Sequence, residues 1–253
     1  MFELNKIEGF AIVTGGARGL GAAMSEELAS EGYNVLINHV SEGSRAKAEA
    51  LAEKLEKEYG VKAITFKGDV ADYDTCKAMV QAGVDAFGDK IAVLINNAGI
   101  QSNQTFEAMD PAHYQQLIGI ELLGSMHMTH LVLPYMQKVN AGCIISMSSI
   151  CGLYGQDTQA DYSAAKAGLI GFSRAIAREN AARHIRVNCI APGLIKTDMV
   201  AGLPEDIVEQ FRLGIPMQML GEPKDIAQAM AYIVNAPYLT GQVISPNGGS
   251  AMY

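Results

Sequence analysis

The stretch FAIVTGGARGLG at residues 10–21 decides the fold of this chain. Residues 10–14 form a short apolar run with β-branched side chains, which is typical of a buried strand. Residues 15–21 follow directly and contain four glycines. Glycines at a strand-to-helix turn let the backbone approach a pyrophosphate, which then lies at the positive end of the helix. The spacing is G-x-x-x-G-x-G, and taken alone such a loop could also be a turn that binds no ligand.

The same alternation of short apolar runs and longer amphipathic stretches continues along the chain. After a helix that is expected to end near Ser30, the pattern predicts strands at residues 35–38, 63–66, 92–95, 143–146, 185–188 and 242–245. It predicts helices between them, among which are residues 45–59, a long helix that ends near Lys138 and a short one at 204–213. This order implies βαβ units and a parallel sheet covered on both faces. We predict an α/β chain with a Rossmann-type doubly wound fold, one domain over residues 1–253 and a parallel sheet of about seven strands.

Composition excludes several classes of protein. The chain has 253 residues, of which 49% are hydrophobic and 18% charged, as in an ordinary globular domain. Its net charge of −8 argues against a nucleic-acid partner, which would need clustered Lys and Arg. No apolar run approaches the roughly 20 residues of a membrane helix, and the start MFELNKIEGF lacks a signal-peptide pattern. The four cysteines have no CxxC spacing. We therefore expect a cytoplasmic protein with reduced cysteines and no membrane contact.

Several segments resemble the cofactor-binding motifs of the short-chain dehydrogenase/reductase family, from about Gly9 to the C-terminus. Residues 14–21 match its TGxxxGxG loop, residues 96–99 its NNAG motif, and residues 192–197 the segment that the family lays against a nicotinamide. The resemblance also puts Asp69, followed by Val70, beside the adenine. Together with the end of the second strand, it implies a nicotinamide cofactor held by Thr14, Gly15, Arg18, Gly19, Leu20, Gly21, Ser41, Asp69, Val70, Asn97, Ala98, Gly99, Tyr162, Lys166, Pro192, Gly193, Ile195 and Thr197.

Ser149, Tyr162 and Lys166 match the catalytic set of that family, in the spacing Ser-(12 residues)-Tyr-x-x-x-Lys. Reduction of a ketone needs a proton donor at the oxygen, and the ordinary tyrosine pKa of about 10 is high for this task. A lysine four residues later lies on the same helix face, where its charge favours the phenolate. Ser149 can bond the substrate oxygen. Without the other motifs, Tyr-x-x-x-Lys could equally be a solvated helix face.

The second strand indicates the cofactor type. An NAD enzyme usually has a carboxylate at the end of this strand, on the ribose 2′-OH, whereas residues 37–41 read INHVS. Arg18 could face a 2′-phosphate, with Ser41 and Arg45 as helpers. We predict NADP(H), with NAD as the alternative because Glu42 could also reach the ribose.

Glu121 marks a departure from the family. Most members have an asparagine on the helix before the fifth strand, which holds a water that links the lysine to solvent, and aligning residues 118–124 puts Glu121 in its place. We expect Glu121 to take part in the proton relay by accepting a hydrogen bond from that water. In the alternative, Glu121 points away and its backbone alone supports the water.

Residues 162–172 and 239–249 most resemble 3-oxoacyl-[acyl-carrier-protein] reductases, which implies a 3-oxoacyl thioester substrate and a homotetramer. An acidic carrier would need a basic patch, for which the resemblance offers Lys138, Arg174, Arg178 and Arg183, although Asn140 stands where a basic residue is common in that group. One alternative is a dehydrogenase of a free small molecule such as a hydroxysteroid, a diol or a sugar alcohol. Another is a cofactor-binding protein without turnover.

Two further patterns carry weaker expectations. His127 and His130 have the i, i+3 spacing of a metal pair, but no third ligand is visible, so we expect no metal. Met199, Met217 and Met219 flank the short helix at 204–213, where they suit either an apolar substrate lid over about residues 194–214 or plain core packing.

Overall fold

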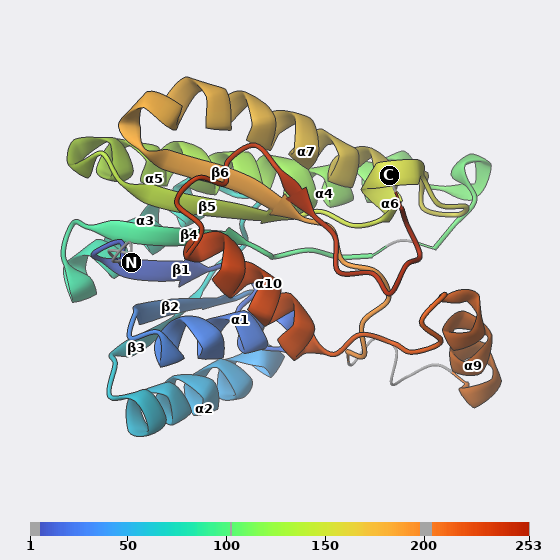
Figure 1. Ribbon diagram of the computed structural model, residues 1–253, viewed down its shortest axis with the longest axis horizontal. Coiled ribbons are helices and arrows are strands. Elements are labelled where there is room, and N and C mark those ends of the chain that lie inside the picture. Colours follow the sequence, from blue (N-terminus) through green and yellow to red (C-terminus); the bar gives the residue numbers. More distant parts are fainter. Residues whose placement is uncertain (1–5, 102, 198–203, 253) are drawn as a thin grey trace.

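The seven predicted strands form one sheet. The computed structural model describes residues 6–101, 103–197 and 204–252. The sheet has the order β3-β2-β1-β4-β5-β6-β7, and every neighbouring pair is parallel (Figure 1). The strands are β1 (Phe10–Val13), β2 (Asn34–His39), β3 (Ala63–Lys67), β4 (Ile91–Asn96), β5 (Gly142–Met147), β6 (Ile185–Ile190) and β7 (Val243–Ile244). The predicted doubly wound fold is confirmed, because each expected strand lies within two residues of these bounds.

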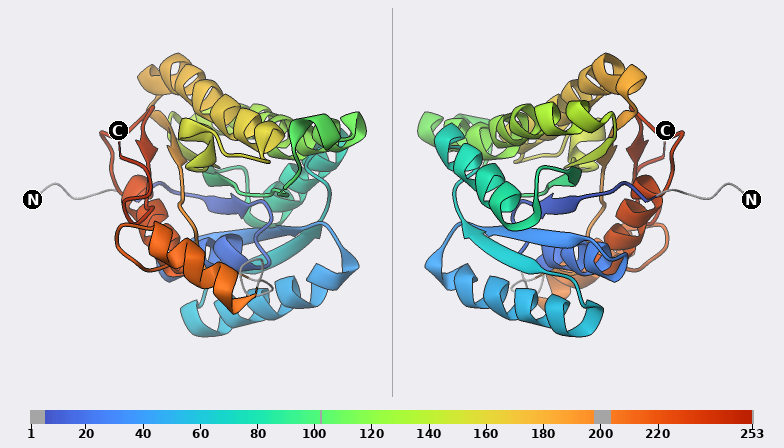
Figure 2. Two further views of the ribbon diagram at one scale, coloured as in Figure 1. Left: turned by 90° about the vertical axis from the view of Figure 1, so that its right-hand side faces the viewer. Right: turned by 90° about the vertical axis from the view of Figure 1, so that its left-hand side faces the viewer.

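Helices cover both faces of the sheet (Figure 2). The α-helices of the described residues are α1 (Gly19–Ser30), α2 (Glu42–Tyr59), α3 (Tyr73–Phe87), α4 (Pro111–Ile118), α5 (Gly124–Val139), α6 (Cys151–Tyr154), α7 (Ala160–Asn180), α9 (Glu205–Gly214) and α10 (Pro223–Val234). α2 begins three residues before the predicted Arg45, because Ser41 and Ser44 form a capping box that supports an earlier start. A π-helical turn, Gly119–Leu123, joins α4 to α5.

Successive side chains of each buried strand point to opposite faces of the sheet, so the strands contribute to two hydrophobic cores. In β1, Ala11 and Val13 face the core under α1, α2 and α10, whereas Phe10 and Ile12 face the core under α3, α5 and α7. Because helices cover both faces of the sheet, the side chains on both faces are apolar. Each strand therefore appears in the sequence as a continuous apolar run, without alternating polar residues. This is why their positions could be read directly from the sequence.

The helical stretch Pro111–Val139 corrects one expectation. By length and composition it could cross a membrane, with a mean hydropathy of 1.2, whereas the sequence analysis found no apolar run of that size. Packing within the fold accounts for part of its composition: α5 packs on α3, β4 and β5, and 39% of the apolar window is buried. Met128, Val132 and Met136 on α5 are fully buried in the core on that face.

The segment predicted as a lid projects from the body of the molecule at α9 (Figure 1). Phe211 and Leu213 on α9 are 46% and 56% exposed, and Met217 and Met219 beyond it are 65% and 49% exposed. The alternative of plain core packing is therefore wrong for these two methionines. Met199 lies outside the described residues.

Arg186, in β6, caps the carboxyl end of α10. Its Nη1 donates to the backbone oxygen of Ile233 at 2.6 Å, and its Nη2 donates to that of Val234 at 2.7 Å. The residue is 7% exposed. The last carbonyls of a helix have no partner inside the helix, so this buried guanidinium satisfies groups that would otherwise be left without a donor.

We expect Arg186→Met to lower the free energy of unfolding by about 2 kcal/mol, because it leaves these buried carbonyls unpaired. Urea denaturation at constant pH measures the change. Arg183→Met, at an exposed position nearby, is the matched control and should change stability by less than about 0.5 kcal/mol. Equal denaturation midpoints for the two variants would contradict the capping role.

Candidate active site

The predicted site residues gather at the carboxyl ends of adjacent strands. The glycine loop follows β1, the NNAG residues lie at the end of β4, Ser149 follows β5, and the 192–197 segment follows β6. The chain order of the sheet reverses between β1 and β4, because β2 and β3 lie on one side of β1 and the later strands on the other. In doubly wound sheets, ligands bind in the crevice at such a point.

The hydroxyl of Thr14 joins the ends of β1 and β4. Its Oγ1 donates to the backbone oxygen of Ile95 at 3.2 Å and accepts from the amides of Asn97 and Ala98 at 2.9 and 3.0 Å. Asn97 Nδ2 donates in turn to the backbone oxygens of Thr14 and Gly15 at 2.9 and 3.1 Å. Hydrogen bonds thus join four of the predicted cofactor residues, which are Thr14, Gly15, Asn97 and Ala98.

The glycine loop forms a cradle that side chains would fill. Gly15 and Gly19 have φ angles of +61° and +53°, which glycine adopts without strain. A Cβ on Gly21 would lie 2.3 Å from the backbone oxygen of Gly15. α1 begins within this loop, and Arg18 at its N-cap makes no side-chain capping bond, so the first amides of α1 are available to an anion. The cradle therefore fits a pyrophosphate.

Asn38, at the end of β2, supports this cradle and was missed by the sequence analysis. The side chain is buried; its Oδ1 accepts from the amide of Gly15 at 3.0 Å, and its Nδ2 donates to the backbone oxygen of Gly68 at 2.9 Å. Asn38 thus holds the glycine loop against the loop after β3. An amide side chain near the end of an apolar strand was the available signal.

Asp69 and Val70 follow Gly68 at the same edge of the sheet. Asp69 is exposed, and its Oδ1 accepts from the amide of Ala71 at 2.9 Å. Val70 is 4% exposed and packs so closely on Gly124 that a Cβ there would lie 2.6 Å from Val70 Cγ2. Both residues lie at the carboxyl edge of the sheet beside the loop that Asn38 holds, and their contact with an adenine stays a prediction.

The segment after β6 returns toward the glycine loop. The backbone oxygen of Pro192 accepts from the amide of Ile150 at 3.1 Å, and Ile195 is buried. Thr197 Cγ2 would lie 3.7 Å from a Cβ on Gly19. This predicted cofactor segment thus lies against the glycine loop.

Ser149, Tyr162 and Lys166 meet at the carboxyl end of β5. Ser149 is 8% exposed, and its Oγ accepts from the amide of Cys151 at 3.1 Å. Tyr162 and Lys166 lie one turn apart on α7, with Lys166 Nζ 5.2 Å from the centre of the tyrosine ring. Lys166 is 5% exposed and donates to the backbone oxygen of Met147 at 2.6 Å. The three residues thus form one polar cluster, in which Ser149 and Lys166 are buried and Tyr162 is half-buried.

The surroundings of Tyr162 raise its pKa above the ordinary value. Burial is the largest cause; the Lys166 ammonium lowers the pKa, the Glu121 carboxylate raises it, and a hydrogen bond with Ser149 lowers it. For Lys166, burial alone would lower the pKa, but the charges of Glu121 and Tyr162 outweigh burial and raise it. At neutral pH the phenol therefore carries its proton and the lysine its charge.

Glu121 contacts Lys166 directly. Its Oε2 lies 2.6 Å from Lys166 Nζ, and its side chain is 1% exposed. The sequence alone predicts a water between the two groups, so this contact is closer than predicted. The alternative, in which Glu121 points away from the site, is wrong.

A comparison of the whole chain with known proteins agrees with this arrangement of the site residues. The model of the family described as short chain dehydrogenase matches residues 9–207. The chain belongs to this family. As a short-chain dehydrogenase it is an oxidoreductase that acts on CH–OH or keto groups with a nicotinamide cofactor.

Similar proteins in this family include reductases of acyl thioesters. The chain is 40% identical over 244 residues to the 3-oxoacyl-[acyl-carrier-protein] reductase FabG of Staphylococcus aureus strain Mu50, which covers 96% of this chain and 98% of that protein. It is 40% and 41% identical over 242 residues to the acetoacetyl-CoA reductases of Rhizobium meliloti and Shinella zoogloeoides, covering 94% of this chain and 97% of each relative. The sequence-based assignment to the family, most like the first of these reductases, is confirmed.

The two histidines considered as metal ligands contact an aromatic ring instead. The ring centres of His127 and His130 lie 5.4 and 6.0 Å from that of Tyr73, and His127 Nδ1 lies 3.2 Å from the backbone oxygen of Val70. Within residues 6–101, 103–197 and 204–252, no three His, Cys, Asp or Glu side chains are grouped as metal ligands.

We expect Gly21→Ala to weaken binding of the dinucleotide by at least about tenfold, because the added methyl group would displace the backbone of Gly15 and close the cradle. Titration of the cofactor by its fluorescence gives the dissociation constant. Gly171→Ala on α7, where a Cβ would meet nothing within 4 Å, is the control and should leave cofactor binding unchanged. Equal dissociation constants for the two variants would exclude the cradle as the pyrophosphate site.

Proposed function

We propose that this short-chain dehydrogenase is an NADP(H)-dependent reductase of 3-oxoacyl thioesters, with Tyr162 as its proton donor. The observation that carries the proposal is the cluster of Ser149, Tyr162 and Lys166, which lies at the same edge of the sheet as the glycine cradle. A bound nicotinamide would supply the hydride. The residues 14–21, 97–99 and 192–197 that surround the crevice would hold it.

The chain itself would supply orientation and the proton. Ser149 would donate a hydrogen bond to the ketone oxygen and fix it near the Tyr162 hydroxyl. Because the pKa of Tyr162 is raised by burial, its phenol is protonated at neutral pH and ready to donate as negative charge develops on that oxygen. The Lys166 ammonium would then stabilise the phenolate that remains. In the reverse direction, the phenolate would accept the proton of the alcohol.

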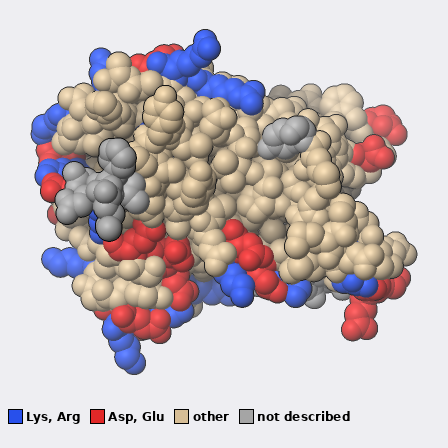
Figure 3. All heavy atoms as spheres, in the orientation of Figure 1, with Lys and Arg blue, Asp and Glu red and all other residues tan. Residues whose placement is uncertain are grey.

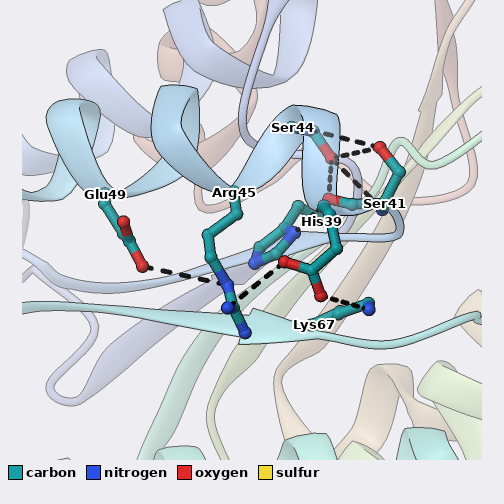
Figure 4. Close-up of polar contacts among 7 residues, drawn as sticks. His39, Ser41, Ser44, Arg45, Glu49 and Lys67 are labelled. Atoms are coloured by element: carbon teal, nitrogen blue, oxygen red, sulfur yellow. Dashed lines mark hydrogen bonds and ion pairs between the residues drawn. The ribbon is translucent and has the colours of Figure 1, made fainter.

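The end of β2 supports a preference for NADP(H) (Figure 4). Ser41 caps α2, and the basic side chains of Arg45 and Lys67 both pair with Glu42. Arg45 Nη1 lies 3.2 Å and Lys67 Nζ 2.5 Å from the carboxylate oxygens of Glu42. Glu42 is therefore engaged by two cations rather than free for a ribose hydroxyl. A 2′-phosphate carries more charge than a carboxylate and would compete for the same two cations.

The thioester substrate is supported by the relatives and by the charge distribution over α7. The relatives' names specify acyl-carrier-protein and CoA substrates. Figure 3 shows Lys and Arg atoms gathered along the edge over α7, whose exposed residues include Arg174 and Arg178. Arg174 shares a hollow with Leu153 and Tyr154 of α6, close to Ser149 in the chain. A phosphate or an acidic carrier would be attracted there. By contrast, Lys138 is paired with Asp89 at 2.5 Å.

We further propose, on the resemblance to the reductases alone, that the enzyme is a cytoplasmic homotetramer. Size-exclusion chromatography with light scattering tests the assembly.

We expect Tyr162→Phe to lower kcat for reduction of acetoacetyl-CoA by about a thousandfold, because the variant keeps the ring but lacks the proton to donate. The cofactor dissociation constant should change by less than about threefold, since the residue is proposed to act on the substrate oxygen. Initial rates with NADPH measure the first quantity and fluorescence titration the second.

Tyr232→Phe removes a hydroxyl from an exposed tyrosine on α10 and should keep normal activity. If Tyr162→Phe retained more than about a tenth of wild-type kcat, Tyr162 could not be the proton donor. If the wild type reduced free cyclic ketones but no thioester, the substrate class would be wrong while the role of Tyr162 remained.

We expect the wild-type kcat/KM to be higher with NADPH than with NADH. Arg45→Ala should lower the kcat/KM for NADPH about tenfold, because it removes a charge-assisted hydrogen bond to the 2′-phosphate. The kcat/KM for NADH should change little, because NADH has no 2′-phosphate. Lys57→Ala, at the far end of α2, is the control for a lost positive charge. An equal loss with both cofactors would show that Arg45 does not contact the 2′-position.

A further inference from the structure

The carboxylate of Glu121 joins two segments that are far apart in the sequence. Its Oε2 pairs with Lys166 Nζ at 2.6 Å, while its Oε1 accepts from the amide of Ile100 at 2.8 Å. Glu121 lies in the π-helical turn between α4 and α5, a feature often found at functional sites. The same side chain therefore contacts the lysine of the proposed catalytic cluster and the loop after β4, next to the predicted cofactor residues.

Space around the carboxylate is limited on the side of that loop. A Cβ on Gly99 would lie 2.4 Å from Glu121 Oε1, so the backbone of the loop rests directly on the carboxylate. The side chains of Glu121 and Lys166 are 1% and 6% exposed. Ions buried to this degree are costly unless each is paired, and here each is the other's counter-ion. Neither can move without leaving a buried charge alone.

We propose that Glu121 is a positioning residue that holds the Lys166 ammonium and the loop after β4 in a fixed relation, and that its negative charge sets the pH range in which Tyr162 exchanges its proton. This inference rests on the proposed function, because it assigns Tyr162 and Lys166 the roles given there. It adds that Lys166 acts on Tyr162 together with the opposite charge of Glu121, and not as an isolated positive charge.

The charges around Tyr162 decide in which direction its pKa moves when Glu121 is replaced. The ammonium of Lys166 favours the Tyr162 phenolate, and a carboxylate beside that ammonium opposes it. The other titratable groups around the cluster are Cys151 on α6 and Cys189 on β6. Asp161, which precedes Tyr162, faces His113 of α4, with 3.7 Å between Oδ2 and Nε2. None of these groups pairs with Lys166 in the described residues, so Glu121 is its counter-ion there.

The test is the pH dependence of turnover in Glu121→Gln, which keeps the size and the acceptor for Ile100 but removes the charge. We expect the pH midpoint for alcohol oxidation, where Tyr162 must lose its proton, to move down by about one pH unit. In the reduction direction, the loss of activity at high pH should move down equally. Glu179→Gln removes the same charge from an exposed position on α7 and should leave both midpoints unchanged.

Glu121→Asp separates charge from position. It keeps the negative charge but is too short to contact both Lys166 and the amide of Ile100. We expect its pH midpoint to stay near that of the wild type and its kcat to fall about tenfold, because a small displacement of a catalytic group is costly. If Glu121 were only structural, both variants would lose stability while the midpoint stayed the same.

A second readout does not depend on turnover. The ultraviolet absorbance of tyrosinate, recorded as the difference between the chain and its Tyr162→Phe variant, reports ionisation of Tyr162 directly. Adding Glu121→Gln to both should move this ionisation to lower pH. If the enzyme turned over no ketone, the proposed function would fail and this titration would still decide the inference. If turnover and the Tyr162→Phe result were as expected but neither midpoint moved, the inference about Glu121 would be overturned and the function would stand.

Discussion

The hydrogen bonds of the Thr14 hydroxyl hold together the two strands between which the order of the sheet reverses, and the active site depends on that junction. One oxygen connects the end of β1 to three backbone groups at the end of β4, those of Ile95, Asn97 and Ala98. Each bond contributes only about 1 kcal/mol, but leaving any of these buried groups unpaired would cost more. The junction fixes the glycine cradle on one side and the loop over Glu121 on the other, so the cofactor crevice and the catalytic cluster share one frame.

Burial of the Lys166 ammonium imposes the second constraint. The residue is 5% exposed, so its ammonium needs acceptors and a counter-charge from the protein. The carboxyl end of β5 supplies a carbonyl through Met147, and the π-helical turn supplies a carboxylate through Glu121. These two contacts tie α7 to the sheet and to the α4–α5 connection. The same contacts that stabilise the charge therefore orient the helix face that presents Tyr162.

Charge is handled differently at the two ends of the crevice. Near Tyr162 the ion pair of Glu121 and Lys166 is buried, and its two charges act on the pKa of Tyr162 in opposite directions. At the end of β2, Glu42, Arg45 and Lys67 form an exposed cluster. Exposed pairs are weak and exchange easily, so these three side chains are held less firmly than the buried pair of Glu121 and Lys166.

The sequence by itself determined the fold class, the strand positions and the local motifs. Strands buried on both faces appear as short apolar runs, and the Tyr162–Lys166 spacing is one helical turn, so both can be read from neighbouring residues. Contacts between distant segments could not be read in this way. The direct pairing of Glu121 with Lys166, the support of the cradle by Asn38 and the capping of α10 by Arg186 each join residues that are more than twenty positions apart. The apolar composition of Pro111–Val139 likewise reflects packing on α3 and β4. Only the tertiary structure decided these features, because a single sequence records which side chains are polar or charged but not which partner each one meets once the chain is folded.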